Sequence, residues 1–255
     1  MHKIIITFLF GVFALFGYGQ AELKTDFEKG VKLLKSENYK KAIEIFSGVL
    51  KKATDNELKK FCYIYRAFSY EGLNDYQNAI PDLDKAINLD TSDIASYTDR
   101  GKTKTYANDL DGAQNDFLFI LTKDSIGDQG QAALYYLAKI DYQLNKFEES
   151  IKYYNKLIAL TTNDAELYFN RGAAKAMLMN STDAIKDYDK AIELKPDYME
   201  AYANRGVSKI NLLTKKGNIQ PTKEQTNDGC ADLKKAKQLG DKTVDDMIYI
   251  YCSKK

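Results

Sequence analysis

The stretch YFNRGAAKAMLMNSTDAIKDYDKAIELKP, residues 168–196, decides the fold of this chain. Apolar residues recur at helical spacing before Asn180, and the same spacing resumes after it, which predicts two amphipathic helices joined by a short turn. Gly172 and Ala184 mark where the two helices cross closely, because a large side chain there would hold the backbones apart. Pro196 ends the second helix, since its ring cannot donate to the helical hydrogen-bond ladder.

The same pair of small residues recurs along the chain. The first residue of each pair follows the first residue of the preceding pair by 34 or 37 residues. The pairs are Gly30 and Ala42, Ala67 and Ala79, Gly101 and Ala113, Ala138 and Ser150, Gly172 and Ala184, and Gly206 and Gly229. Six two-helix hairpins are therefore expected, near residues 23–52, 60–90, 94–124, 131–161, 165–197 and 199–240.

This pattern resembles the tetratricopeptide repeat (TPR). The small, Ala, aromatic, Ala and Pro positions of that family are occupied by Gly172, Ala184, Tyr188, Ala191 and Pro196. The resemblance implies an all-α, right-handed superhelical solenoid of about six repeats with a concave groove. One hairpin cannot bury its apolar face alone, so residues 20–255 are expected to form one solenoid domain. Residues 243–252 are expected to form a helix that caps the last open face.

The sixth copy carries an insertion. Its two small residues are 23 residues apart, whereas those of the other copies are 12 apart. The extra residues predict a loop near residues 214–228, and long polar loops of this kind are usually connectors.

The N-terminal residues 1–19 have the composition of a secretory signal peptide. Lys3 is followed by an apolar run that ends at Phe16, and small residues precede Gln20. The run is shorter than the roughly 20 residues that span a bilayer, although an uncleaved anchor is the alternative. We therefore expect an exported protein, periplasmic or extracellular and of bacterial origin, with no integral membrane span once the signal is removed.

Composition argues against an enzyme and against nucleic acid as a partner. Lys plus Arg number 37 against 36 Asp plus Glu, a net charge of +1 that steers the chain toward no polyanion. The one histidine, His2, lies inside the expected signal, so the mature chain has no imidazole for a catalytic triad, a typical zinc site or proton transfer near neutral pH. No catalytic residue, metal site or cofactor is predicted.

Arg and Asp occur together in four copies and are both missing from the other two. In these copies Arg directly precedes the first small residue and Asp follows the second by three residues. The pairs are Arg66 with Asp82, Arg100 with Asp116, Arg171 with Asp187, and Arg205 with Asp232. One interpretation is an ion pair that joins the two helices of a repeat; the other is a stripe of cations for acidic ligands. Their joint occurrence favours the ion pair.

The resemblance places one face of each first helix in the groove. Candidate partner-binding residues on or beside that face are Phe61, Ile64, Tyr65, Phe68, Lys102, Tyr106, Tyr135, Tyr136, Lys139, Tyr142, Asn170 and Asn204. Aromatic rings with interspersed Lys suit a peptide, although many of the 19 Tyr residues must simply fill helix junctions. Some members of the family grip the C-terminal carboxylate of chaperones with Lys and Asn. Here only Asn170 and Asn204 match that clamp, which is therefore not supported.

Cys230 and Cys252 form a candidate disulfide. Cys230 occupies a position that is apolar in other copies, and Cys252 ends the expected capping helix. If the two helices run antiparallel, their thiols meet; two buried free thiols are the alternative. Cys62 is expected to be a small core residue.

These observations predict a non-enzymatic scaffold that binds a protein or peptide segment in its groove. The alternatives are a structural subunit of a cell-envelope assembly, and a module that binds a glycan or another small molecule. The sequence predicts no oligomeric state.

Overall fold

The computed structural model describes residues 21–215 and 221–253, and within these ranges it contains helices and no strand. The helices form six successive hairpins, so the predicted all-α class of repeated helix pairs is confirmed. Their bounds are α1 Ala21–Lys35, α2 Tyr39–Lys52, α3 Asn56–Glu71, α4 Tyr76–Leu89, α5 Ile94–Tyr106, α6 Leu110–Lys123, α7 Asp128–Gln143, α8 Phe147–Leu160, α9 Ala165–Met177, α10 Ser181–Leu194, α11 Met199–Lys215 and α12 Lys223–Gln238. The expected signal peptide lies outside the described residues.

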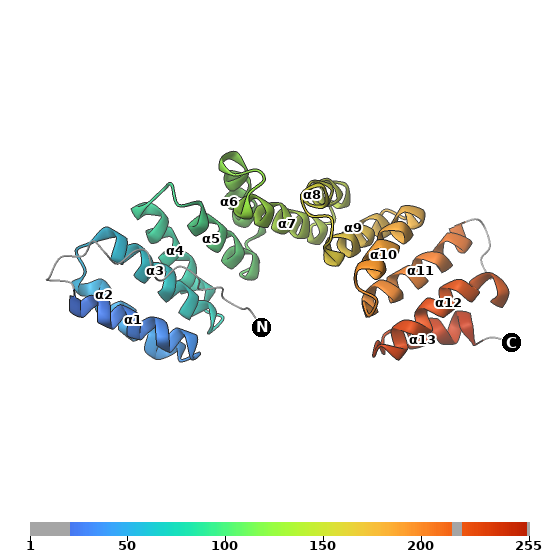
Figure 1. Ribbon diagram of the computed structural model, residues 1–255, viewed down its shortest axis with the longest axis horizontal. Coiled ribbons are helices and arrows are strands. Elements are labelled where there is room, and N and C mark those ends of the chain that lie inside the picture. The colour runs from blue at the N-terminus through green and yellow to red at the C-terminus, as the bar shows by residue number, and fades with distance from the viewer. Residues whose placement is uncertain (1–20, 216–220, 254–255) are drawn as a thin grey trace. The chain divides into compact units, whose positions relative to one another are not determined.

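The chain divides into two compact units, one ending at Asp116 and the other beginning at Phe117. Within the first unit each helix from α1 to α5 packs against the next, and within the second unit the same holds from α7 to α12 (Figure 1). First helices of neighbouring hairpins also contact each other, α1 with α3 and α9 with α11. A solenoid repeat touches only its neighbours, so such a chain is held together by local interfaces rather than one central core.

Capping side chains and left-handed turn residues set the ends of the helices. The carboxylate of Asp55 accepts a hydrogen bond from the backbone N–H of Leu58, and Asp75, Asp93, Asp164 and Asn180 cap later helices in the same way. The turns inside the first five hairpins each place one residue at φ between 55° and 62°. These residues are Glu37, Asn74, Asn108, Asn145 and Met179. Asn is the non-glycine residue that best tolerates this conformation, which explains its use at three of the five turns.

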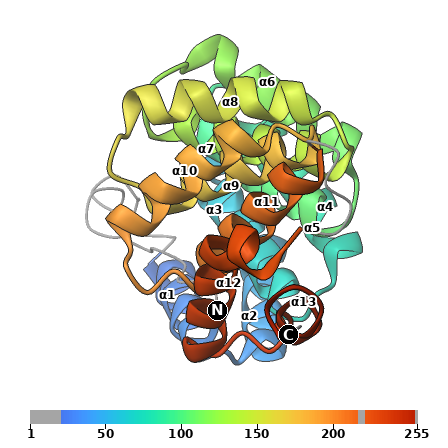
Figure 2. The same cartoon turned by 90° about the vertical axis from the view of Figure 1, so that its right-hand side faces the viewer.

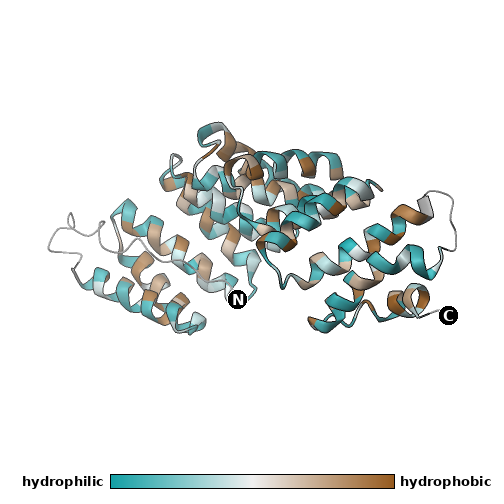
Figure 3. Cartoon of the chain, turned by 45° about the vertical axis from the view of Figure 1, so that its right-hand side comes forward, coloured by the Kyte–Doolittle hydropathy of each residue, from teal (hydrophilic) through white to brown (hydrophobic). Residues whose placement is uncertain are grey.

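Small residues let the paired helices approach. Ala184 and Ala191 are fully buried, and a Cβ atom added at Gly172 would lie 2.9 Å from the ring of Tyr188. Figure 3 shows the result for the helices as a whole, which are hydrophobic on some faces and hydrophilic on others. The small residues therefore recur in the sequence because each hairpin contains one of these close helix crossings.

Gly206→Ala is expected to lower the free energy of unfolding by about 1 to 2 kcal/mol. An added Cβ atom would lie 2.8 Å from the carbonyl oxygen of Gly229, and backbone atoms cannot move aside as a side chain can. Gly48→Ala is the matched control, because a Cβ atom there meets nothing within 4 Å. It should leave stability unchanged or raise it by up to about 1 kcal/mol, since Ala is the better helix former. Urea unfolding of the two variants tests the difference, and equal effects would contradict it.

The C-terminal end differs in two details from the expectation. The loop predicted near residues 214–228 is shorter, because α11 extends to Lys215 and α12 already begins at Lys223. A capping box explains the early start: Thr222 accepts a hydrogen bond from the backbone N–H of Gln225, whose side chain accepts one from the backbone of Thr222. The expected cap is a short turn, α13 Asp245–Met247, that continues as a π-helix, η3 Ile248–Cys252. The turn α13 lies beside α12 (Figures 1 and 2).

Candidate functional site

Each of the four Arg residues singled out in the sequence forms two hydrogen bonds with the Asp of its own hairpin. In the fifth hairpin Nε of Arg171 lies 2.9 Å from Oδ2 of Asp187, and Nη2 lies 2.6 Å from Oδ1. The same atoms connect Arg66 with Asp82, Arg100 with Asp116, and Arg205 with Asp232. The four carboxylates are buried. This bidentate geometry is the strongest that Arg and a carboxylate can form.

The remaining nitrogen of each Arg reaches the preceding hairpin, which sequence reasoning missed. Nη1 of Arg171 donates to Oδ1 of Asn155 in α8 over 2.7 Å. The corresponding acceptors are Ser47 for Arg66, Asp84 for Arg100 and Asp189 for Arg205. The acceptor always lies five residues after the second small residue, but its type changes, so only its spacing could have revealed it. Each Arg therefore joins three helices.

Lys side chains complete these clusters. Lys104, Lys175 and Lys209 lie one turn after their Arg, and each ammonium lies 2.7 to 2.9 Å from the same Asp carboxylate. The cations are thus neutralised inside the molecule. This arrangement supports the structural interpretation and leaves no stripe of unpaired cations at these positions.

In the first unit, several groove candidates pack into helix junctions. The ring of Tyr65 lies 5.4 Å from that of Phe27 and 6.0 Å from that of Phe68, and Phe61 packs against the same core. Ile64 is only 8% exposed, so it is a core residue and not a groove contact as predicted. The period placed Ile64 on the groove face but could not show how deeply neighbouring helices would cover it.

The other two candidates of this unit differ in their surroundings. Tyr106 is exposed, and its ring stacks on that of Tyr76 at 6.3 Å. Burial raises the pKa of Asp99 and of Glu71, and Lys102 lies close enough to both carboxyls for its charge to oppose that rise. Lys102 is therefore balanced by acidic neighbours within its own unit.

Asp99 has the most perturbed carboxyl group in this unit, and sequence reasoning missed it. Burial raises its pKa to about 7, and the charges of Glu71 and Asp93 add to the rise, whereas Lys102 opposes it. Burial also raises the pKa of Glu71, which accepts a hydrogen bond from the hydroxyl of Thr103. The cause is a meeting of α3 and α5, which no single stretch of sequence reveals.

Asp99→Asn is expected to remove a pH-dependent loss of stability. The folded-state pKa of Asp99 lies near 7, whereas the usual value is about 3.9. Between these two pH values the folded wild type therefore keeps a proton on Asp99 that the unfolded chain has lost. Its stability therefore falls as the pH rises from about 4 to about 7. The Asn variant should equal the wild type near pH 4 and become progressively more stable than the wild type as the pH rises to about 8. Urea unfolding at several pH values measures this difference, and a difference that does not change with pH would contradict it.

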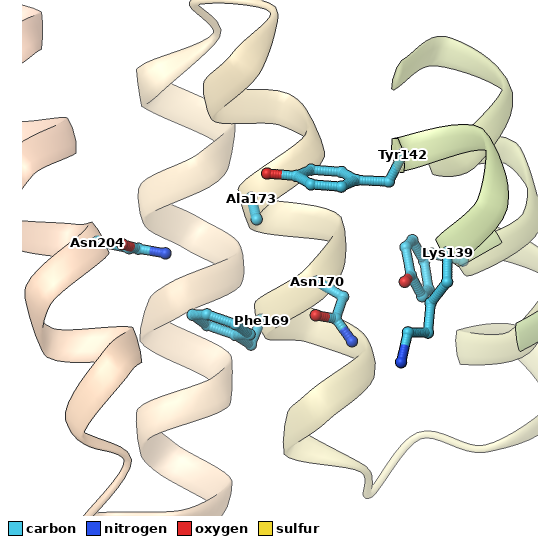
Figure 4. Close-up of a pocket in the computed structure, with 7 residues that line it drawn as sticks. Lys139, Tyr142, Phe169, Asn170, Ala173 and Asn204 are labelled. Carbon is cyan, nitrogen blue, oxygen red and sulfur yellow. The ribbon is translucent and has the colours of Figure 1, made fainter. Parts of the chain in front are cut away.

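In the second unit a hollow of about 240 Å³ lies among α7, α8, α9 and α11. Its lining is mostly apolar, with one ammonium and two amides, and consists of Lys139, Tyr142, Tyr154, Phe169, Asn170, Ala173 and Asn204. Figure 4 shows Lys139 and Tyr142 reaching in from α7, Phe169 and Asn170 from α9, and Asn204 from α11. Four predicted groove residues are thus brought together. Phe169, Ala173 and Tyr154 were missed.

The hollow combines fixed aromatic rings with unpaired polar groups. The ring of Phe169 is held between those of Tyr198 and Tyr188, at 4.9 and 5.9 Å. Asn204 is hydrogen-bonded to Tyr188. By contrast, the amide of Asn170 has no hydrogen-bond partner among the described residues. A rigid apolar floor beside free hydrogen-bonding groups is typical of a binding site.

Two more candidates of the second unit do not line the hollow. The hydroxyl of Tyr135 donates a hydrogen bond to Glu166, and the ammonium of Lys139 lies 5.2 Å from the centre of the Tyr135 ring. Tyr136 instead stacks on Phe117, with ring centres 5.1 Å apart. Tyr135 therefore supports a residue of the hollow, and Tyr136 fills a helix junction.

Cys230 and Cys252 form a disulfide with Cα atoms 5.6 Å apart. It connects α12 to the C-terminal cap, where the hydroxyl of Thr226 also donates a hydrogen bond of 3.1 Å to the carbonyl of Tyr251. Cys62 is buried with a free thiol, and burial raises its pKa to about 12. Cys62 is therefore an unreactive core residue.

The described part of the chain contains no cluster of three or more His, Cys, Asp or Glu side chains placed to hold a metal ion. Over the same ranges no helix has the length and apolar character needed to cross a membrane.

Comparison with known proteins places this chain among repeat proteins. Protein-family models described as "Tetratricopeptide repeat" match residues 63–93 and 165–198, and a family model described as "TPR repeat" matches residues 138–178. Protein unc-45 homolog B of Xenopus tropicalis is 28% identical over 182 residues, which cover 61% of this chain and 20% of that protein. The chain thus spans about a fifth of the length of this relative.

Solved structures show the same fold at low sequence identity. A tetratricopeptide repeat protein from Parabacteroides merdae is 15% identical and superimposes with a TM-score of 0.67 over 90% of this chain and 98% of that one. YrrB, described as "a TPR protein with an unusual peptide-binding site", is 21% identical with a TM-score of 0.58, over 76% of this chain and 92% of its own.

Proposed function

Because this chain is built from tetratricopeptide repeats, we propose that it is a non-enzymatic interaction scaffold that binds a peptide or protein segment in the hollow of its second unit. The observation that carries the proposal is the free amide of Asn170 beside the ring of Phe169, inside a mostly apolar hollow. A buried apolar contact supplies affinity, and a few fixed polar groups supply orientation. The peptide-binding site named for YrrB, which has the same fold, is consistent with this proposal.

An extended segment fits the hollow better than a helix. At about 240 Å³, the hollow has room for one or two side chains and not for a helix about 10 Å wide. Asn170 and Asn204 come from neighbouring first helices, and each amide offers both a donor and an acceptor. Such amides can pair with the free N–H and C=O groups of an extended main chain, which a helix would keep for itself. An apolar side chain of the segment would then rest on Phe169.

Selection from a library of random peptides displayed on phage tests this function. Peptides that bind the wild type should lose about tenfold or more in affinity on Asn170→Ala, because two main-chain hydrogen bonds disappear. Asn170 has no partner among the described residues, so its replacement leaves the fold intact. Phe169→Ala should weaken binding further.

The matched control is Met177→Ala, which removes an exposed side chain from the same helix outside the hollow. It should bind the selected peptides as the wild type does. The proposal would be overturned if no peptide is selected, or if the selected peptides bind the Asn170→Ala and Phe169→Ala variants as tightly as the wild type. Assembly that grows with protein concentration in light scattering would instead favour a structural subunit.

We also propose that the protein is exported. The N-terminal sequence motivates this, and the bond between Cys230 and Cys252 supports it, because disulfides persist in oxidising compartments and are rare in the cytosol. Mass spectrometry of the protein recovered from cell fractions would test it. A cytosolic protein that keeps its first 19 residues would contradict it.

A further inference from the structure

We propose that the hollow of the second unit selects segments that carry an internal Asp or Glu, whose side chain pairs with the ammonium of Lys139. This inference rests on the proposed function and adds the chemistry of the partner. Of the seven residues that line the hollow, Lys139 alone carries a charge. Figure 4 shows it at the α7 side, across from Asn170.

Lys139 differs from the other Lys residues that follow the small positions of the repeats. Lys104, Lys175 and Lys209 are each held by a buried Asp, and Lys102 lies near Asp99 and Glu71. Lys139 is exposed and forms no ion pair with any described residue. Lys139 directly follows the small residue Ala138, whereas Lys104, Lys175 and Lys209 follow theirs by three residues. Its ammonium therefore does not take the place at which those three Lys residues meet a buried Asp.

Tyr135 sets the position of this free cation. Its ring lies under the ammonium at 5.2 Å, and its hydroxyl is tied to Glu166, which limits rotation of the ring. A cation held over an aromatic face is partly desolvated and less mobile than a Lys in water, so less entropy is lost when a carboxylate binds. Glu166 is already bound to Tyr135 and does not neutralise Lys139.

The lining favours a side-chain carboxylate over the terminal carboxylate of a chain. Sites for a chain terminus usually surround it with several backbone N–H groups or cations, whereas this hollow supplies one cation. The amides of Asn170 and Asn204 extend the binding groups from α9 to α11, so a segment can continue past Lys139. The expected motif is an acidic residue close to an apolar residue that rests on Phe169.

A charge-swap experiment with the selected peptides tests this inference. Replacing the acidic residue of a peptide by its amide, Asp by Asn or Glu by Gln, should weaken binding to the wild type about tenfold. The same replacement should have no effect on Lys139→Gln. Lys139→Glu should prefer a peptide with Lys at that place. Lys156→Glu is the matched control, since Lys156 is also exposed, lies 5.8 Å from a Tyr ring and does not line the hollow.

The outcomes separate this inference from the proposed function. If Asn170→Ala weakens binding while the Lys139 variants and the acidic replacement change nothing, the hollow binds peptides but the acidic preference is wrong. If amidation of the peptide C-terminus weakens binding and the internal replacement does not, Lys139 binds a chain terminus, which also overturns the inference. If Lys139→Glu and Lys156→Glu had equal effects on binding, Lys139 would act only through the overall charge of the protein. That result would also overturn the inference.

Discussion

Arg171→Ala lowers the free energy of unfolding by about 3 kcal/mol in our expectation, because it leaves a buried carboxylate with too few partners. Asp187 is 4% exposed and loses both hydrogen bonds from the guanidinium, so only Lys175 remains beside it. Asn155 in α8 loses its donor as well. The variant therefore weakens both the fifth hairpin and its interface with the fourth. Urea unfolding monitored by circular dichroism measures the loss.

Two further variants separate this network from ordinary surface charge. Lys186→Ala breaks an exposed pair with Asp183, four residues from Asp187, and should give no measurable change. Arg171→Lys keeps the charge but cannot bond Asp187 twice and Asn155 at once, so it should recover less than half of the loss. If Arg171→Ala were as mild as Lys186→Ala, the three-helix junction would contribute nothing to stability.

The helix pairs could be predicted because each depends on residues within a single repeat. The period of the small residues follows from close packing between helices such as α9 and α10, and every copy repeats the constraint. The Arg and Asp pairs were visible for the same reason, since both partners lie within one hairpin. The acceptors on the preceding hairpin stayed hidden because Ser47, Asp84 and Asn155 serve equally well. A guanidinium N–H needs only an oxygen, so no single residue type is required there.

The candidate site was only partly predictable because exposure depends on several repeats at once. Helical spacing placed Ile64 and Phe169 at equivalent positions, three residues before the first small residue, yet Ile64 belongs to a core and Phe169 lines the hollow. The raised pKa of Asp99 likewise comes from burial in the folded chain, to which the charge of Glu71 on another helix adds. Phe169 was overlooked because, in the sequence, an aromatic residue of the hollow and one of a helix junction look alike.

Cleavage of the bond between Cys230 and Cys252 is expected to lower the free energy of unfolding by about 3 kcal/mol, because the open chain gains conformational entropy when it unfolds. The bond closes a loop with a sequence separation of 22 residues. It fastens η3 to α12, where Cys230, Leu233, Val244 and Cys252 share one buried cluster. Thermal unfolding with and without a reducing agent measures the change.

Cys252→Ser supplies the control for this prediction. The variant should unfold as the reduced wild type does, and the reducing agent should have no further effect on it, because Cys62 is already a free thiol. The hydrogen bond from Thr226 to Tyr251, the ion pair of Lys237 with Asp245 and the apolar contacts of the cluster then hold the cap. Hydrogen exchange of the amides in η3 should therefore quicken more than that of the amides in α9. Equal quickening in both helices would mean that the bond stabilises the whole unit rather than its terminal cap, and an unchanged melting temperature would contradict the prediction itself.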